Sequence, residues 1–309
     1  MNYAVLFPGQ GAQYVGMGAD LFESASELLV ERADEILGWS LKDMCLVGSE
    51  EALTRTEHAQ PALYALAYAL WQDFSAAMGN RQPSAAGGHS LGEYTALTAA
   101  GALSFENGLR LVAERGLAMA AAADLEPSAM AALLGADPDL AEGIAANRRS
   151  AGGRLWVANL NAPGQVVVAG GEADIDWVVE QSREFGVRRA VKLNVAGAFH
   201  TPFMAPAAEQ LSDSIADVEF SEPRFDVYGN VTAAPLGANL GQGLVDQLTS
   251  PVRFAESLAN MSDVGVEVFV HVGPGDVTAG MARRSAPDRE VLVVNDQESL
   301  EAAVQRLAI

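Results

Sequence analysis

Residues 84–101 read SAAGGHSLGEYTALTAAG, a short run of small residues followed by a helical stretch. We expect a strand over Ser84–Gly88, although Ala and Gly are poor strand formers, and a helix over about Leu91–Ala100 that Gly101 closes. Gly88 to Gly92 fits the pattern G-x-S-x-G, whose glycines allow the sharp strand-to-helix turn that lifts a serine oxygen out of a sheet. Ser90 is therefore a candidate nucleophile, and a chance glycine-rich loop is an equally good interpretation of so short a pattern.

On both sides of this turn, apolar strand-like runs alternate with helical stretches, which indicates an α/β fold. Strands are expected over Tyr3–Phe7, Val264–Val272 and Glu290–Val294, and helices over Gln60–Phe74, Glu106–Ala123 and Ser299–Leu307, with Ser299 as an N-cap. Between them lie strand-like runs at Ala129–Gly135, Leu155–Asn159, Gln165–Ala169 and Val187–Asn194, with a helix around Ile175–Phe185. This segment of about 70 residues is predicted to be a small α+β unit inserted into a larger α/β domain.

The composition restricts the class of protein. With 309 residues and 50% hydrophobic composition, the chain can bury a large core in one big domain or two smaller ones. The formal net charge of −21 disfavours nucleic-acid binding and attachment to anionic lipid, because both need a basic surface. The single cysteine, Cys45, the absence of a basic residue before Arg32 and the lack of a long apolar run predict a cytoplasmic protein that does not span a membrane.

A nucleophilic serine needs a base, and the chain has four histidines: His58, His89, His200 and His271. His89 would point away from Ser90 at the turn, His58 is expected in a polar loop, and His271 in an apolar strand. His200 precedes Thr201 and Pro202, which are typical of an N-cap and a first helical residue. A strand-to-helix junction and a helix N-terminus favour a neutral imidazole that can act as a general base. A structural loop histidine is the other interpretation.

Arg115 lies on the expected helix over Glu106–Ala123, on the same stripe as Leu111 and Met119. A buried arginine is costly unless it is paired. Its partner could be a substrate carboxylate, held by two parallel hydrogen bonds. The helix pattern alone favours an internal ion pair with an Asp or Glu instead.

Seven segments in order along the chain carry a family resemblance: Phe7–Gln13, Gly88–Glu93, Glu114–Gly116, Asn159–Gly170, Ala198–His200, Asn230–Thr232 and Gln247–Val252. Together they resemble the malonyl-CoA:acyl carrier protein transacylases of fatty-acid synthesis and the related acyltransferase domains of polyketide synthases. The resemblance implies an α/β-hydrolase-like large domain, residues 1–126 and 198–309, with an inserted ferredoxin-like small domain, residues 127–197.

The resemblance also implies catalytic roles. Ser90 would form an acyl ester, and His200 would deprotonate Ser90 and later activate the thiol of the carrier protein. The main-chain carbonyl of Gln247, rather than an aspartate, would orient His200. The backbone N–H groups of Gln10 and Leu91 would form the oxyanion hole.

On the substrate side, the resemblance implies that Arg115 holds the malonyl carboxylate and that Asn161 contributes to substrate binding. Phe199 would crowd a 2-methyl branch and so favour malonyl groups, and Leu91 agrees with that. Malonyl-CoA would be a substrate, and no metal or redox cofactor is expected. The G-x-G-x-x-G fingerprint of dinucleotide-binding loops fails at Tyr14, which stands where its last glycine would be.

The expected partner is an acyl carrier protein. Because such carriers are acidic and this chain is acidic too, docking needs a local basic patch. We hypothesise that Arg283 and Arg284 on one side, and Arg188, Arg189 and Lys192 on the other, flank the cleft; ordinary solvated charges are an equally good interpretation. Asp276 stands where many relatives carry Lys, so the docking surface cannot simply be transferred from them. A monomer is expected.

Three other functions remain open. The first is an acyl-thioester hydrolase of the same fold, for which Arg115 would have no use. The second is a general esterase with the triad order Ser, acid, His, where Asp137 or Asp174 would be the acid. The third is a non-catalytic carrier-binding module, against which the presence of both Ser90 and His200 argues. The sequence does not distinguish a fatty-acid from a polyketide pathway.

Overall fold

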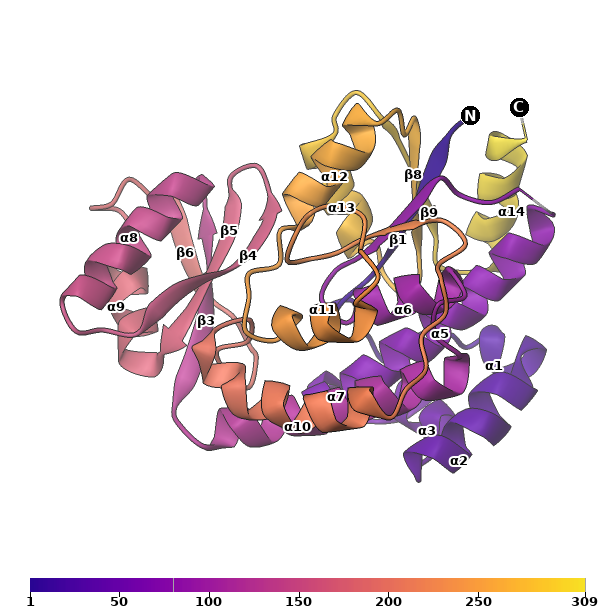
Figure 1. Cartoon of the computed structure of the whole chain (residues 1–309), viewed down its shortest axis with the longest axis horizontal. Helices are drawn as coiled ribbons and strands as arrows, with labels where there is room; N and C mark the ends of the chain where they lie inside the picture. The colour runs from indigo at the N-terminus through magenta and orange to yellow at the C-terminus, as the bar shows by residue number, and fades with distance from the viewer. Residues whose placement is uncertain (80, 309) are drawn as a thin grey trace.

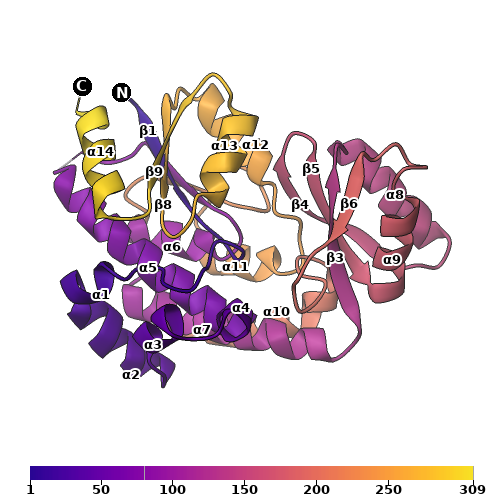
Figure 2. The ribbon, with the colours of Figure 1, turned by 180° about the vertical axis from the view of Figure 1, so that it is seen from behind.

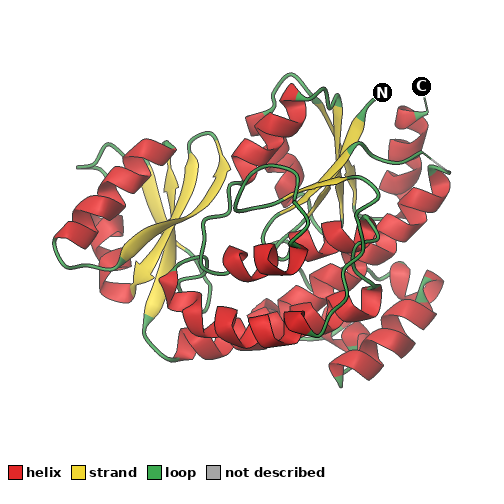
Figure 3. Ribbon diagram, in the orientation of Figure 1, coloured by secondary structure: helices red, strands yellow, loops and turns green. Residues whose placement is uncertain are grey.

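The computed structural model describes residues 1–79 and 81–308, and it contains two separate sheets (Figures 1 and 3). The larger sheet has five parallel strands in the order β7-β2-β1-β8-β9. Their bounds are β1 Tyr3–Phe7, β2 Ala85–Gly88, β7 Asp226–Tyr228, β8 Val268–Val272 and β9 Glu290–Val294. All five residues of β1 are buried, which is typical of a central parallel strand covered on both faces.

Helices cover both faces of this sheet (Figures 1 and 2). The helices that pack directly on the sheet are α5, α6, α12, α13 and α14. The helical segments of the large domain are α1 Leu21–Ser24, a π-helical segment Glu27–Arg32, α2 Ala33–Leu37, α3 Leu41–Leu46, α4 Glu50–Thr54, α5 Thr56–Ala77, α6 Gly92–Ala99, α7 Phe105–Asp124, a 3₁₀ turn Pro202–Met204, α10 Ala205–Ala216, α11 Leu240–Gln247, α12 Phe254–Asp263, α13 Val277–Ser285 and α14 Gln297–Leu307. Val5 and Phe7 belong to the core that includes α5, whereas Ala4 and Leu6 belong to the core that includes α12 and α13. Successive side chains of β1 therefore point to opposite faces of the sheet and contribute to the hydrophobic core on each face.

The second sheet forms a small domain at one end of the molecule (Figure 1). Its elements are β3 Ser128–Leu134, α8 Pro138–Ser150, β4 Leu155–Ala162, β5 Gln165–Gly171, α9 Glu172–Gln181 and β6 Arg189–Lys192. The strands are antiparallel in the order β4-β5-β3-β6, and they enclose a core of their own with α8 and α9. This βαββαβ arrangement is ferredoxin-like, and the predicted fold class of a large α/β domain with such a small domain is confirmed.

Several sequence-based expectations need correction. His58 does not lie in a loop, because α5 begins at Thr56, whose side chain is buried. Ser299 is not an N-cap: Asp296 caps α14, and Ser299 is the third helical residue, whose hydroxyl completes a capping box. The helix α8 was missed, although Asp137 at its N-cap and Pro138 at its first position are typical start signals.

No helix among residues 1–79 and 81–308 combines the length and the low polarity that crossing a membrane would require.

Candidate active site

Ser90 lies at the turn between β2 and α6, with the left-handed backbone conformation of a strained elbow (φ 53°). The flanking glycines are required by the close approach of neighbouring backbone. A Cβ at Gly88 would lie 1.9 Å from the carbonyl carbon of Gly92, and one at Gly92 would lie 2.5 Å from the main-chain oxygen of Phe7. The pattern G-x-S-x-G is therefore a steric consequence of how β1, β2 and α6 meet, and a chance loop is excluded as its explanation.

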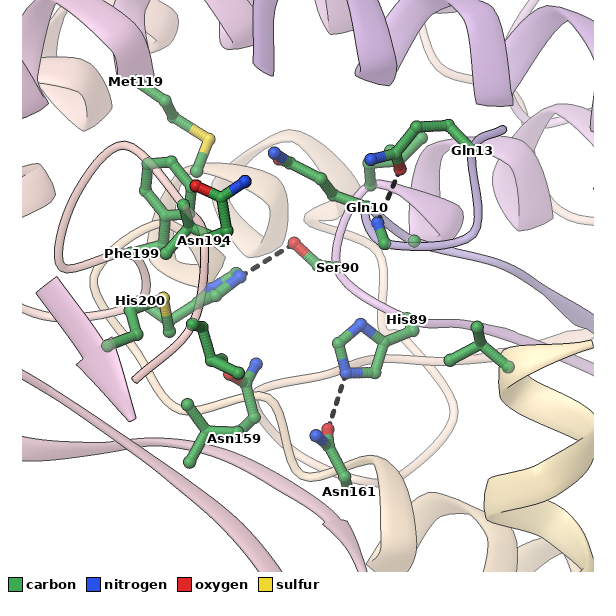
Figure 4. A pocket seen from close by; sticks show the side chains of 18 of the residues that line it. Gln10, Gln13, His89, Ser90, Met119, Asn159, Asn161, Asn194, Phe199 and His200 are labelled. Carbon is green, nitrogen blue, oxygen red and sulfur yellow. Dashed lines mark hydrogen bonds between the residues drawn. The ribbon is translucent and has the colours of Figure 1, made fainter. Parts of the chain in front are cut away.

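Ser90 and His200 are in hydrogen-bond contact, with 2.8 Å between Oγ of the serine and Nε2 of the histidine (Figure 4). The Nδ1–H of His200 donates to the main-chain carbonyl oxygen of Gln247 at 2.9 Å. Because a carbonyl oxygen only accepts, this bond leaves Nε2 free to accept the proton of Ser90. Burial, with the nearby charge of Arg115, lowers the pKa of His200 to about 3, so its imidazole is neutral at pH 7.

Arg115 of α7 is buried, with 1% of its surface exposed. Its Nη1 donates to Oε1 of Gln60 at 2.5 Å, and its Nη2 donates to Oγ of Ser90 at 2.9 Å and to Oε1 of Gln247 at 3.0 Å. The internal ion pair that the helix pattern favoured is wrong, since no Asp or Glu among the described residues lies within salt-bridge distance of this guanidinium. A cation is thus held beside the candidate nucleophile by neutral oxygens and by the ring of Tyr94, whose centroid lies 5.6 Å from Cζ of Arg115.

The predicted oxyanion hole consists of two backbone N–H groups, those of Gln10 and Leu91. Gln10, in the segment after β1, and Leu91, the residue that precedes α6, both line the same cavity as Ser90. Neither group donates a hydrogen bond to another described residue. The side chain of Gln10 is held by the hydroxyl of Thr56, which donates to its Oε1 at 2.9 Å. Unpaired N–H groups beside a nucleophile are what an oxyanion hole requires.

The cavity has a volume of about 350 Å³ and lies between the two domains. The small domain contributes Met130, Asn159, Asn161 and Val167 to its walls, and the segment before His200 contributes Phe199. His89 points away from Ser90, and its Nε2 lies 2.7 Å from Oδ1 of Asn161 (Figure 4). Phe199, predicted to limit the size of the acyl group, and Asn161, predicted to bind substrate, therefore both line the cavity.

The structure brings together all of the residues predicted from the sequence to form the site. Ser90, His200, Gln10, Leu91, Arg115, Phe199 and Asn161 line the cavity, and Gln247 contacts His200 and Arg115 from behind it. Sequence reasoning assigned no role to Gln60, Glu93 or Asn230, which also join this hydrogen-bond network. The role of Glu93 could have been suspected from its position. It is the one charged residue of α6, a helix that is buried along its whole length, and a buried charge needs partners.

The arginines of the hypothetical docking clusters differ in their surroundings. Arg188, Arg189 and Arg283 are exposed. Arg284 donates to Oε1 of Gln165 at 2.6 Å and to the main-chain oxygen of Pro163 at 2.5 Å, so it ties α13 to the small domain. Lys192 is paired with the carboxylates of Glu172 and Asp176, which reduces its value as a free cation.

Comparisons with known proteins show the family of this chain. The profile of the acyl transferase domain matches residues 5–300. A malonyl CoA-acyl carrier protein transacylase of Bacillus subtilis is 38% identical over 308 residues, which cover 98% of this chain and 96% of that protein. The crystal structure of an acyl-carrier-protein S-malonyltransferase from Burkholderia pseudomallei superimposes with a TM-score of 0.94 at 37% identity, over 99% of this chain and all of that one.

Another similar structure is a complex with an acyl carrier protein. It is a malonyl-transacylase in complex with a type II polyketide synthase acyl carrier protein, similar at a TM-score of 0.94 and 34% identity, over 99% of this chain and 100% of that one.

Proposed function

The chain belongs to the acyl transferase domain family, together with its malonyl CoA-acyl carrier protein transacylases, and we propose that it transfers malonyl from malonyl-CoA to the phosphopantetheine thiol of an acyl carrier protein. The observation that carries this proposal is Arg115. Its buried guanidinium lies 2.9 Å from Oγ of Ser90 and forms no salt bridge within the part of the chain that the structure describes, which fits an acyl group that ends in a carboxylate. A hydrolase of neutral acyl chains would have no use for it.

The first half-reaction acylates Ser90. His200 Nε2 takes the hydroxyl proton while Oγ attacks the thioester carbonyl carbon, and the N–H groups of Gln10 and Leu91 bind the resulting oxyanion. Collapse of this intermediate breaks the carbon–sulfur bond, and the imidazolium of His200 returns the proton to the coenzyme A thiolate. Arg115 exchanges its bond to Oγ for two parallel bonds to the malonyl carboxylate.

The second half-reaction runs the same steps with a different nucleophile. The carrier thiol gives its proton to His200 and attacks the ester carbonyl, and the same oxyanion hole is used again. The proton then returns to Oγ of Ser90 as malonyl leaves on the carrier. The exchange is ping-pong, and it uses no metal or redox cofactor.

Transfer and hydrolysis can be separated in one experiment. With malonyl-CoA and a carrier protein that bears phosphopantetheine, the chain should convert most of the malonyl groups to malonyl-carrier. With the carrier lacking phosphopantetheine, consumption should nearly stop after the enzyme itself is acylated. Both products are measured by mass spectrometry and by release of free malonate. Malonate as the main product in both reactions would support the hydrolase instead.

We further propose that the carrier docks beside the cleft through Arg283 and Arg284, with Arg188 and Arg189 facing it from the small domain. Charge reversal at Arg283 and Arg284 should raise the KM for the carrier by about three- to tenfold and leave the KM for malonyl-CoA nearly unchanged. Because Arg284 also bonds to Gln165 and Pro163, Arg283→Glu alone is the cleaner test.

A control for this docking test is Arg306→Glu, which makes the same change of net charge on α14 and also breaks the pair of Arg306 with Glu290. This helix lies at the end of the large domain opposite the small domain (Figure 1). An unchanged carrier KM in Arg283→Glu, or an equal rise in Arg306→Glu, would remove the docking proposal.

A further inference from the structure

Beneath the elbow that carries Ser90 lies a buried carboxylate that forms no salt bridge with any basic side chain among residues 1–79 and 81–308. Glu93 follows Ser90 by three residues in α6 and is 1% exposed. Its Oε2 accepts the backbone N–H of Asn230 at 2.8 Å and Nε2 of Gln247 at 3.0 Å. Neither bond reaches the cavity, so Glu93 contacts no substrate; its effect on the reaction must pass through the groups that it holds.

Gln247 connects Glu93 to every reacting group of the site. Its Oε1 accepts from Arg115, and its Nε2 donates to Glu93 and to the main-chain oxygen of Ser90 at 3.0 Å. Its own main-chain oxygen accepts the Nδ1–H of His200. One fully buried glutamine thus contacts the nucleophile's backbone, the base and the carboxylate anchor.

The charge of Glu93 decides which way the Gln247 amide points. The amide lies between a guanidinium, which only donates, and a carboxylate, which only accepts when ionised. In the observed orientation both ends of the amide are satisfied. The flipped orientation would place an N–H group against Arg115 and an oxygen against Glu93, and two unsatisfied buried contacts would result. Protonation of Glu93 removes half of this constraint, because a carboxylic acid can also donate.

Asn230 extends the same support to both sides of the elbow. Its Oδ1 accepts the backbone N–H of Ser90 and its Nδ2 donates to the main-chain oxygen of Gly88, each at 2.7 Å. The backbone N–H of Asn230 is in turn bound by Glu93. The strained conformation of Ser90 is therefore held by a segment that Glu93 anchors.

We propose that Glu93 is a positioning residue whose ionised, buried carboxylate fixes Gln247 and Asn230 and thereby sets the geometry of Ser90, His200 and Arg115. The inference rests on the proposed acyl transfer through Ser90. It predicts that the reactivity of Ser90 depends on the protonation of Glu93.

The protonation of Glu93 falls in an accessible pH range. Burial raises the pKa of Glu93 to about 7, although the hydrogen bonds from Asn230 and Gln247 and the charge of Arg115 oppose that rise. Arg115 of α7 is the charged group that faces it, and Tyr94 of α6 is the other titratable one; the segment of Asn230 and helix α11 present neutral amides. Burial lowers the pKa of His200 to about 3, well below that of Glu93, so the two groups are expected to titrate in different pH ranges.

The test compares the wild-type chain with Glu93→Gln, which keeps the shape and cannot ionise. The readout is the rate at which a neutral fluorophosphonate modifies Ser90, because this probe has no titrating group and does not depend on malonyl transfer. At about pH 8.5 the variant should react about 10- to 100-fold more slowly than wild type. The wild-type rate should fall below about pH 7 toward that of the variant, whose own profile should be flat over the same range.

Two further variants separate charge from bulk. Glu114→Gln removes a carboxylate next to Arg115 that makes no bond in this network, so it should keep the wild-type pH profile. Glu93→Asp keeps the charge on a shorter side chain. Its Ser90 should therefore react more slowly than that of the wild type, and the reaction rate should still fall as the pH is lowered below about 7. The proposal would be overturned if the wild-type rate of Ser90 modification did not change with pH. It would also be overturned if this rate fell equally at low pH in the wild type and in Glu93→Gln. A normal profile in a chain that transfers no malonyl would instead count against the proposed function alone.

Thermal unfolding provides a measurement that needs no activity. The pKa of Glu93 is higher in the folded chain, about 7, than its ordinary value of 4.5. The folded chain therefore holds a proton that the unfolded chain has lost between these values, and its stability relative to Glu93→Gln should decrease as the pH rises through that window. A difference in Tm between the two chains that is constant with pH would contradict an ionising Glu93.

Discussion

Ser90→Ala, His200→Ala and the double variant should each transfer malonyl about 10⁶-fold more slowly than the wild-type chain. The three losses should be nearly equal, because the hydroxyl and the imidazole act as one unit. The 2.8 Å contact between Ser90 Oγ and His200 Nε2 is useful only if both atoms are present. The measurement is the initial rate of malonyl-carrier formation at saturating substrates, together with the residual rate of each variant.

Substitution of two aspartates tests the alternative of a general esterase with a carboxylate in its triad. Asp137 caps α8 in the small domain, and Asp174 is paired with Arg148, so neither is placed to orient His200. Asp137→Asn and Asp174→Asn should therefore keep nearly all of the transfer activity, provided that the variants remain folded. Losses in the double variant equal to the product of the two single losses would show that Ser90 and His200 act independently, contrary to the mechanism.

Arg115→Ala should weaken malonyl transfer about 10⁴-fold more than acetyl transfer. A carboxylate buried in this cavity without its guanidinium would be left unpaired, whereas an acetyl group brings no charge into the site. The discrimination should appear as a ratio of kcat/KM values for malonyl-CoA and acetyl-CoA. In the wild-type chain that ratio should strongly favour malonyl-CoA.

A control for Arg115→Ala must account for the hydrogen bonds that Arg115 donates to neighbouring side chains. The substitution also removes the donors of Gln60 and Gln247, and buried acceptors left unpaired reduce stability. Gln60→Ala removes one of the same bonds and leaves the guanidinium in place, so it should slow both substrates to a similar extent. Equal losses of malonyl and acetyl transfer in Arg115→Ala would mean that the arginine only supports the fold.

The elbow and most elements of the larger sheet could be predicted from the sequence for simple physical reasons. Gly88 and Gly92 are the residues that the close approach of β1, β2 and α6 allows, so the pattern around Ser90 reports local sterics. β1 occupies the range that its apolar run predicts, because a strand buried in the middle of a parallel sheet is apolar along its length.

Features that depend on tertiary contacts could not be predicted in this way. His200 lies 110 residues from Ser90, and only elimination among four histidines and the family resemblance selected it. The helix pattern around Arg115 predicted an ion pair, because periodicity shows burial but not the identity of the neighbours. The same limit hid Glu93: its neighbours Asn230 and Gln247 come from segments more than 130 residues away.

The central claim is that malonyl passes through an ester on Ser90, and the intact mass of the chain after mixing with malonyl-CoA tests it most directly. The wild-type chain should gain one malonyl group, and the Ser90→Ala variant should gain none. Addition of the carrier with its phosphopantetheine should then return the wild-type mass to its starting value. A wild-type chain that consumes malonyl-CoA without any gain in mass, or a Ser90→Ala variant that still becomes labelled, would contradict the account.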